Sequence, residues 1–197
     1  MPFQFFFDMT LTACLTVWSP GPNNIMLLST ASKYGIRNNM KFMAGIWTGS
    51  LSLMIICGLL CRTLSSVVPG IAPVMKYVGA CYLLYLAYQT MRRLPPGAKD
   101  SDKEPSYVSG IVLQLVNVKI IIYGLTMFSS FILPHVQAPV LLLGFAFYLM
   151  ALGAIGNLIW AFAGNVLKQY DGKTYKVMTM ILGLLLVWCA VRVVGKI

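Results

Sequence analysis

Long apolar stretches alternate with short polar connections along the chain. A helix needs about 20 mostly apolar residues to cross roughly 30 Å of hydrocarbon, at about 1.5 Å per residue. By this measure the pattern predicts an all-α polytopic membrane protein, with a single transmembrane domain over residues 1–197. Its six expected transmembrane helices are residues 5–31, 42–63, 70–91, 108–133, 138–166 and 176–193.

Basic residues gather in alternate connections between these spans. Ten of the 15 lysines and arginines fall in the first, third and fifth connections, and the positive-inside rule places those connections in the cytoplasm. Both termini are then expected on the outer side. The third connection, residues 92–107, is a cytoplasmic linker between two sets of three spans. Because three is odd, related halves would form a 3+3 inverted repeat, a hypothesis that residue identities do not demonstrate.

Composition narrows the classes of function. The chain is 58% hydrophobic and 10% charged, whereas a soluble domain has about 25% charged residues. The net charge of +10 comes from small basic groups rather than one patch, so no nucleic acid partner is expected. Five cysteines without paired spacing and one histidine predict no metal site and no cofactor. No nucleophile with a base, and no carboxylate pair, shares one depth, which argues against an enzyme.

The first span contains the sequence SPGPNN, residues 19–24. Pro20 and Pro22 lack a backbone donor and push the residues before them, among them Gly21, away from helical dihedrals, so this span should be discontinuous. Pro22 suits the first position of a new helix, whose positive dipole end would point into the membrane. Broken backbone persists at that depth only beside protein or a water-lined cavity. With the polar Asn23 and Asn24, the motif indicates a binding site, and a proline kink without a ligand is the alternative.

The fourth span carries a lysine at depth. Counted from Tyr107, Lys119 lies about 18 Å along the helix, near the bilayer midplane. A lysine there costs about 2.5 to 3.5 kcal/mol, so it should face the bundle interior, unless the span shifts and Lys119 reaches the inner surface. Tyr123 follows one turn later on the same face. Asn117 lies about 200° away on a straight helix. Either Asn117 and Lys119 face different neighbours, or the helix unwinds there and both reach one site.

Glycines occur where spans could pack closely. Gly45 and Gly49 form a GxxxG in the second span, and Gly153, Gly156 and Gly164 lie in the fifth. Small residues let helix backbones approach, so packing is the main interpretation and a substrate path along the glycines is the alternative. These faces permit a homodimer without requiring one.

Three stretches carry a family resemblance. The chain resembles the lysine-exporter superfamily of bacterial six-span amino-acid efflux carriers in SPGPNNIMLLSTASKYGIRNNMKFMAGIWTGS. It is similar to the cysteine and O-acetylserine exporter branch in LQLVNVKIIIYGLTMFSSFILP and LLLVWCAVR. Many family members have proline between the asparagine and lysine of the fourth span, where this chain has Val118. The resemblance covers essentially the whole chain.

This resemblance implies efflux of small neutral amino acids, with cysteine and O-acetylserine foremost, driven by proton antiport across the bacterial inner membrane. The partners would be the amino acid, protons and the lipid bilayer, and both termini would be periplasmic. Open alternatives are export of threonine, homoserine or lysine, a passive membrane channel, and a structural membrane partner. The expected site residues are Pro20, Gly21, Pro22, Asn23, Asn24, Asn117 and Lys119, joined by Tyr123 from the face it shares with Lys119.

Overall fold

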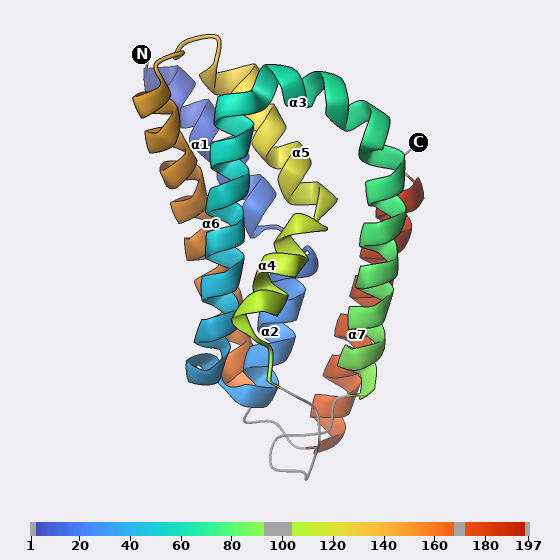
Figure 1. Ribbon diagram of the computed structural model, residues 1–197. Helices are drawn as coiled ribbons and strands as arrows, with labels where there is room; N and C mark the ends of the chain where they lie inside the picture. The colour runs from blue at the N-terminus through green and yellow to red at the C-terminus, as the bar shows by residue number, and fades with distance from the viewer. Residues whose placement is uncertain (1–2, 93–103, 168–171, 196–197) are drawn as a thin grey trace.

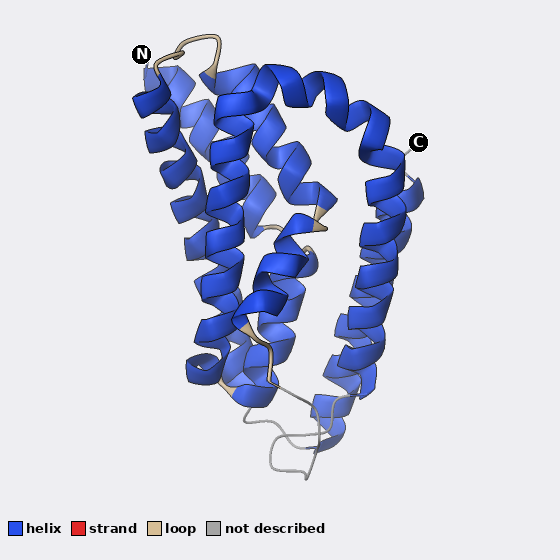
Figure 2. Ribbon diagram, in the orientation of Figure 1, coloured by secondary structure: helices blue, strands red, loops and turns tan. Residues whose placement is uncertain are grey.

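The computed structural model describes residues 3–92, 104–167 and 172–195, and these residues contain helices and no strands (Figures 1 and 2). The all-α prediction is therefore confirmed. The helices are α1 (Phe3–Trp18), α2 (Pro22–Tyr34), α3 (Ile36–Arg92), α4 (Tyr107–Leu115), α5 (Val118–Thr126), the π-helix η1 (Met127–Ile132), α6 (Pro139–Leu167) and α7 (Gly172–Gly195). Most of the predicted linker 92–107 lies outside the described residues.

Among the described residues, three helical segments are long and apolar enough to cross a membrane: Ile36–Cys61, Pro139–Leu167 and Lys173–Val191. A fourth span is formed if Tyr107–Leu115 and Val118–Ile132, which meet at 62°, are counted together. The other two expected spans are helical, as α1 with α2 and as the second arm of α3, but they do not meet this criterion. The six-span count and the inverted repeat therefore stay predictions.

Both predicted helix breaks are present. α1 ends at Trp18, and α2 begins at Pro22 after the extended residue Gly21. α4 ends at Leu115, and α5 begins at Val118. Proline therefore is not needed for the second break, because Asn117 supplies a side-chain cap for α5, accepting a hydrogen bond from the backbone N–H of Lys119.

α3 differs from its prediction. The sequence places a connection at Pro69 and Gly70 between spans 42–63 and 70–91, but the backbone stays helical through both residues and leaves helical geometry at Leu60 instead. Figure 1 shows α3 rising, arching over the end of the molecule and descending beside α7. Proline removes one helix hydrogen bond and bends a helix without having to end it. The turn between these two arms is consequently helical.

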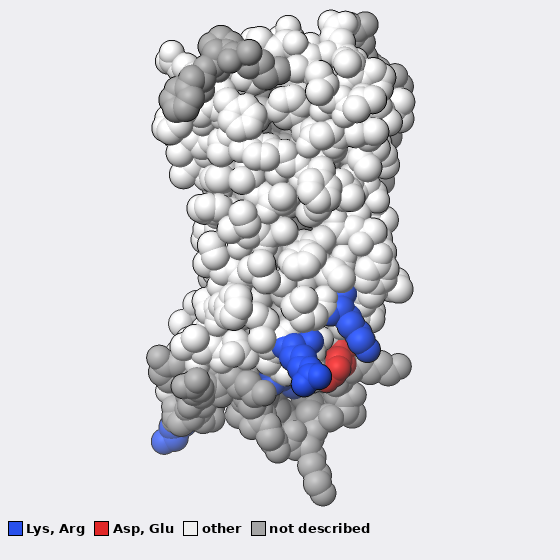
Figure 3. Space-filling view, turned by 90° about the vertical axis from the view of Figure 1, so that its left-hand side faces the viewer, with Lys and Arg blue, Asp and Glu red and all other residues white. Residues whose placement is uncertain are grey.

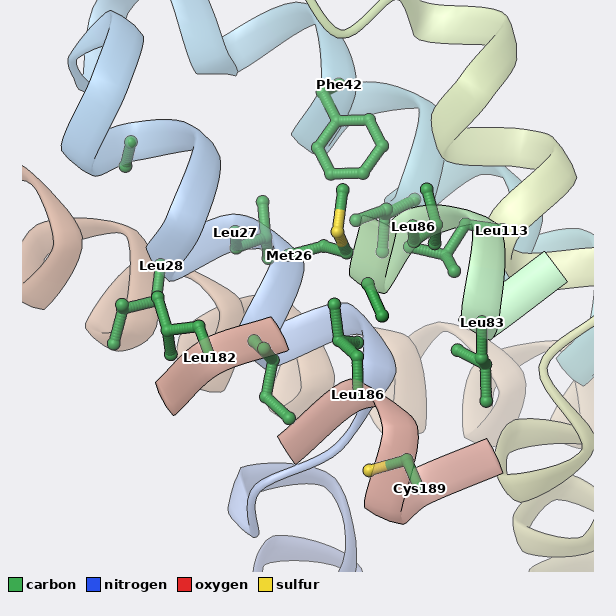
Figure 4. Packing of buried hydrophobic residues seen from close by; sticks show 14 of the residues in the cluster. Met26, Leu27, Leu28, Phe42, Leu83, Leu86, Leu113, Leu182, Leu186 and Cys189 are labelled. Carbon is green, nitrogen blue, oxygen red and sulfur yellow. The ribbon is translucent and has the colours of Figure 1, made fainter. Parts of the chain in front are cut away.

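Apolar side chains form two clusters, one on each side of the helix breaks. One cluster joins α2 with both arms of α3, with α4 and with α7, and includes Met26, Phe42, Leu83 and Leu186 (Figure 4). The other joins α1, α3, α5, η1 and α6. The polar residues of the two breaks lie between the two clusters.

Close backbone contacts hold together the helices around the first of these clusters, the one that contains α2. A methyl group on Gly45 of α3 would overlap the carbonyl oxygen of Tyr107, and one on Gly110 of α4 would overlap that of Phe42. On α6, a methyl group on Gly164 would overlap the carbonyl of Leu28 in α2. The packing interpretation of Gly45 and Gly164 is therefore confirmed, since only a residue without a side chain fits these crossings.

Charge marks one end of the molecule. In Figure 3 the visible lysine and arginine side chains lie at one end, below a long uncharged band. Figure 1 shows that α2 ends and α4 begins at this basic end, while the N- and C-termini lie toward the opposite end. This arrangement agrees with the alternating charge pattern of the connections.

Candidate substrate site

The two helix breaks meet at one place in the bundle. α1 and α4 end there with their C-termini, where carbonyl groups and negative dipole ends face the gap. α2 and α5 begin there with their N-termini, which contribute backbone N–H groups and positive dipole ends. A site with donors and acceptors side by side results, and side chains from both breaks fill it.

A chain of side-chain amides links the two breaks. Asn117 Nδ2 donates to Asn23 Oδ1 at 2.8 Å, and Asn23 Nδ2 donates to Gln114 Oε1 at 2.6 Å. Gln114 Nε2 in turn donates to Ser50 Oγ on α3. We call these four residues the amide chain. It joins α2, α4 and the start of α5 through buried hydrogen bonds and α3 through a partly buried one.

The direction of the amide chain is fixed by the backbone. The N–H of Lys119 can only donate, so the Asn117 atom that faces it at 3.2 Å must be the oxygen Oδ1. The amide nitrogen of Asn117 therefore faces Asn23 and donates to its oxygen. The nitrogen of Asn23 must then face Gln114, so the Gln114 atom that accepts from it is the oxygen Oε1. Each asparagine nitrogen in the chain has two N–H groups and uses one of them within the chain, and each amide oxygen accepts one hydrogen bond with one of its two lone pairs.

The neighbouring Asn24 serves the other side of α2. Its Nδ2 donates to the carbonyl oxygens of Val17 at 2.8 Å and Ser19 at 3.0 Å, which satisfies the C-terminal end of α1. Its Oδ1 accepts from Asn157 Nδ2 of α6 at 3.0 Å. Asn24 thus ties α1, α2 and α6 together at the break, and two adjacent asparagines bind opposite neighbours.

Lys119 reaches the C-terminal end of α1. Its Nζ donates to Ser19 Oγ at 2.9 Å and to the Ser19 carbonyl oxygen at 3.4 Å. Its side chain packs directly on Gly21, where a Cβ would lie 3.0 Å from Nζ. A cation is favourable beside the negative end of a helix dipole. The ammonium group is therefore held by neutral oxygens, and the interpretation that it reaches the inner surface is wrong.

A small cavity lies among these groups. Its volume is about 30 Å³, room for about two water molecules. Tyr123, whose side chain is 4% exposed, borders it with a hydroxyl group that has no hydrogen-bond partner in the structure. A buried hydroxyl without a partner is costly, so this group is available to a ligand or water. Lining residues from the sequence prediction are Gly21, Pro22, Asn23, Asn24, Asn117, Lys119 and Tyr123.

Pro20 is the expected site residue that does not line this cavity; it borders a second, larger cavity together with Ser19. Sequence reasoning missed Ser50, Gln114 and Asn157, which all border the small cavity. Asn157 stands alone in a long apolar span, and a lone amide at that depth is itself a signal for an interior partner. Asn117 and Lys119 reach one site because the helix breaks just before them, which decides the question left open by the sequence.

Comparison with known proteins identifies the family of this chain. The model of the LysE type translocator family matches residues 14–196. The chain belongs to this family. Every residue that lines the small cavity falls within the range that matches the LysE type translocator.

Curated relatives cover nearly the whole chain. A cysteine/O-acetylserine efflux protein of Klebsiella pneumoniae is 38% identical, over 96% of this chain and 95% of its own length. One of Salmonella paratyphi A is 37% identical, over 95% of each chain. One of Escherichia coli O1:K1 is 35% identical, over 91% of this chain and 92% of its own. No solved structure matches this LysE type translocator.

Proposed function

We propose that the protein is a secondary active exporter that moves small neutral amino acids out of the cytoplasm across a bacterial inner membrane by proton antiport. Membership of the translocator family and the efflux proteins among its relatives support export of cysteine and O-acetylserine. The observation that carries the proposal is the Lys119 ammonium at the junction of two broken helices. None of the described residues lining either cavity is Asp or Glu, so this charge is available to a carboxylate.

The site suits the two charges of an amino acid. The substrate carboxylate binds Lys119 and the first backbone N–H groups of α2, which stand at a positive dipole end. The substrate ammonium binds carbonyl oxygens at the C-terminal end of α1, of which Ser19 already accepts from Lys119. Helix ends of both polarities meet here, and discontinuous helices supply such groups in other secondary transporters.

The lining favours a neutral side chain. A substrate such as lysine would bring its side-chain cation next to Lys119 in addition to its α-ammonium, and no carboxylate among the described lining residues would offset it. Two like charges about 4 Å apart repel each other by about 4 kcal/mol at an effective dielectric constant of about 20, the value typical of protein sites. Cysteine and O-acetylserine carry no such charge. This argument separates the proposed substrates from a lysine-type exporter within one family.

Proton coupling is assigned to Lys119. Arrival of substrate from inside and of a proton from outside then alternates, as one part of the bundle rocks against another.

The test is efflux from proteoliposomes that contain the purified protein. They are loaded with labelled cysteine, O-acetylserine, threonine or lysine and studied with and without an imposed proton gradient. We expect gradient-dependent efflux of the first two. Efflux of threonine or lysine in their place would contradict the substrate assignment but not the transport, whereas flux that persists after the gradient is collapsed would identify a passive channel.

A further inference from the structure

A second cavity adjoins Lys119 and also borders Asn117 of the amide chain. Its volume is about 590 Å³, within the range of about 300 to 1,000 Å³ that is typical of ligand sites. Leu83 of α3 and Trp188 of α7 form part of its apolar wall, opposite α1 and α5. Lys119 and Tyr123 border both cavities. The small cavity, at about 30 Å³, is too small for an amino acid, so an amino acid that contacts Lys119 has its room in the larger one.

Hydroxyl groups line this larger cavity along α1. Thr12, Thr16 and Ser19 all border it, and their spacing of i, i+4 and i+7 places them on one helical face. We call these three residues the hydroxyl ladder. It begins at Ser19, which accepts from Lys119, and ends about 10 Å further along α1. On the facing helix, Thr126 lies a similar distance beyond Lys119 and also borders the cavity.

The cavity extends toward one end of the molecule. α1 runs from the terminal end to the break, and α5 runs from the break back toward that end (Figure 1), so Thr12 and Thr126 lie on the terminal side of Lys119. On the basic side, buried apolar side chains of α2, α3, α4 and α7 pack together, among them Met26, Leu86 and Leu182. This structure therefore offers space from Lys119 toward the termini, while this apolar packing closes the way to the basic end.

We infer that the larger cavity is the outward passage of the exporter, through which a neutral amino acid leaves Lys119 along the hydroxyl ladder. This inference rests on the proposed function. The hydroxyl protons of Thr16 and Ser19 go to the carbonyl oxygens of Thr12 and Thr16, so the ladder offers acceptor lone pairs that replace water around the substrate ammonium. The wall from α3 and α7 contacts the substrate side chain. Selection for the amino-acid backbone takes place at the helix breaks, and the passage, which is wide and mostly apolar, tolerates side chains larger than that of cysteine.

One experiment blocks the passage. Thr16→Trp fills it, and Leu15→Trp is the matched control, because Leu15 is 67% exposed and does not border either cavity. We expect Thr16→Trp to lower O-acetylserine efflux at least tenfold. Leu15→Trp should retain efflux within twofold. Wild-type efflux by Thr16→Trp would overturn the inference.

A second experiment needs no substitution and remains decisive if Thr16→Trp does not fold. Cys189 and Cys57 both belong to buried apolar clusters, but Cys189 borders the larger cavity, whereas Cys57 borders neither cavity. Right-side-out vesicles are treated with a membrane-impermeant methanethiosulfonate, and each cysteine is followed by mass spectrometry. We expect Cys189 to be modified from outside, more slowly with O-acetylserine present, and Cys57 to stay unmodified. Modification of Cys189 only from the inner side would contradict an outward passage. Absence of efflux by the wild type would instead refute the proposed function.

Discussion

Two adjacent asparagines organise the centre of this protein, and each has its orientation fixed by backbone groups. Asn23 is oriented through Asn117, which must turn its oxygen to the N–H of Lys119. Asn24 must turn its nitrogen to the carbonyl groups of Val17 and Ser19. Because backbone donors and acceptors cannot exchange roles, neither side chain can reverse without losing a buried hydrogen bond. The polarity of the site is thus set by the two helix breaks.

The end of the amide chain can be tested at Ser50. Ser50→Ala removes the acceptor of Gln114 Nε2, and a buried donor without a partner costs about 1–3 kcal/mol. We expect a lower thermal stability of the detergent-purified protein. Ser52→Ala is the control, because Ser52 is exposed and bonds only within its own helix, to the carbonyl of Thr48; its effect should stay within about 0.5 kcal/mol. Equal stability of the two variants would contradict the amide chain.

At the residue scale, the sequence predicted those residues of the two helix breaks that line the small cavity, and it missed the lining from α3 and α6. The proline, glycine and asparagine residues of the first break and the deep Lys119 follow from rules about donors, dihedrals and the cost of charge in lipid. Gln114 and Asn157 could not be predicted in the same way. A single amide on an apolar helix can face a neighbouring helix or a site, and only the packing of α2 against α4 and α6 shows which.

At the scale of elements, paired half-helices create the site and glycine crossings hold them in place. The break in the first span was predictable from two prolines, whereas that before α5 has no proline and depends on the Asn117 cap. The helical arch of α3 was not predictable, since Pro69 and Gly70 are typical of a loop as well as of a bent helix. Local sequence therefore predicts where a helix is interrupted, whereas tertiary contacts decide whether the chain continues there as a loop or as a bent helix.

The crossing of α3 and α4 can be tested with a matched pair of glycine substitutions. Gly45→Ala would overlap the carbonyl of Tyr107, and overpacking costs about 1–3 kcal/mol. Gly144→Ala is the control, because nothing lies within 4 Å of its Cβ position, and alanine favours a helix by about 0.5–1 kcal/mol over glycine. We expect lower thermal stability and lower efflux for Gly45→Ala only. Unchanged stability of this variant would show that the crossing is looser than described.

At the scale of the whole molecule, charge and apolar length give the protein an orientation. The basic end and the end with both termini are opposite (Figures 1 and 3), and the positive-inside rule supports the proposal that the basic end faces the cytoplasm. In the proposed orientation, the larger cavity is on the periplasmic side of Lys119 and the glycine crossings are on the cytoplasmic side. Export through the proposed passage depends on this orientation.

The orientation predicts the position of the C-terminus. A short epitope tag after Ile197 should be reached by antibody in spheroplasts with an intact inner membrane. A tag inserted in the linker 92–107 is the control and should be reached only after permeabilisation. The opposite pattern would reverse the orientation and would turn the larger cavity toward the cytoplasm.

The central claim is that Lys119 binds the substrate carboxylate, and equilibrium binding tests it most directly. Labelled O-acetylserine is titrated onto the purified wild type, Lys119→Met and Lys41→Met, the last carrying its change at an exposed basic-end residue. Loss of a hydrogen bond to a charged group costs about 1.5–3 kcal/mol, or roughly 10- to 100-fold in affinity. We predict that loss for a well-folded Lys119→Met and an unchanged affinity for Lys41→Met. Wild-type affinity in Lys119→Met would contradict the account.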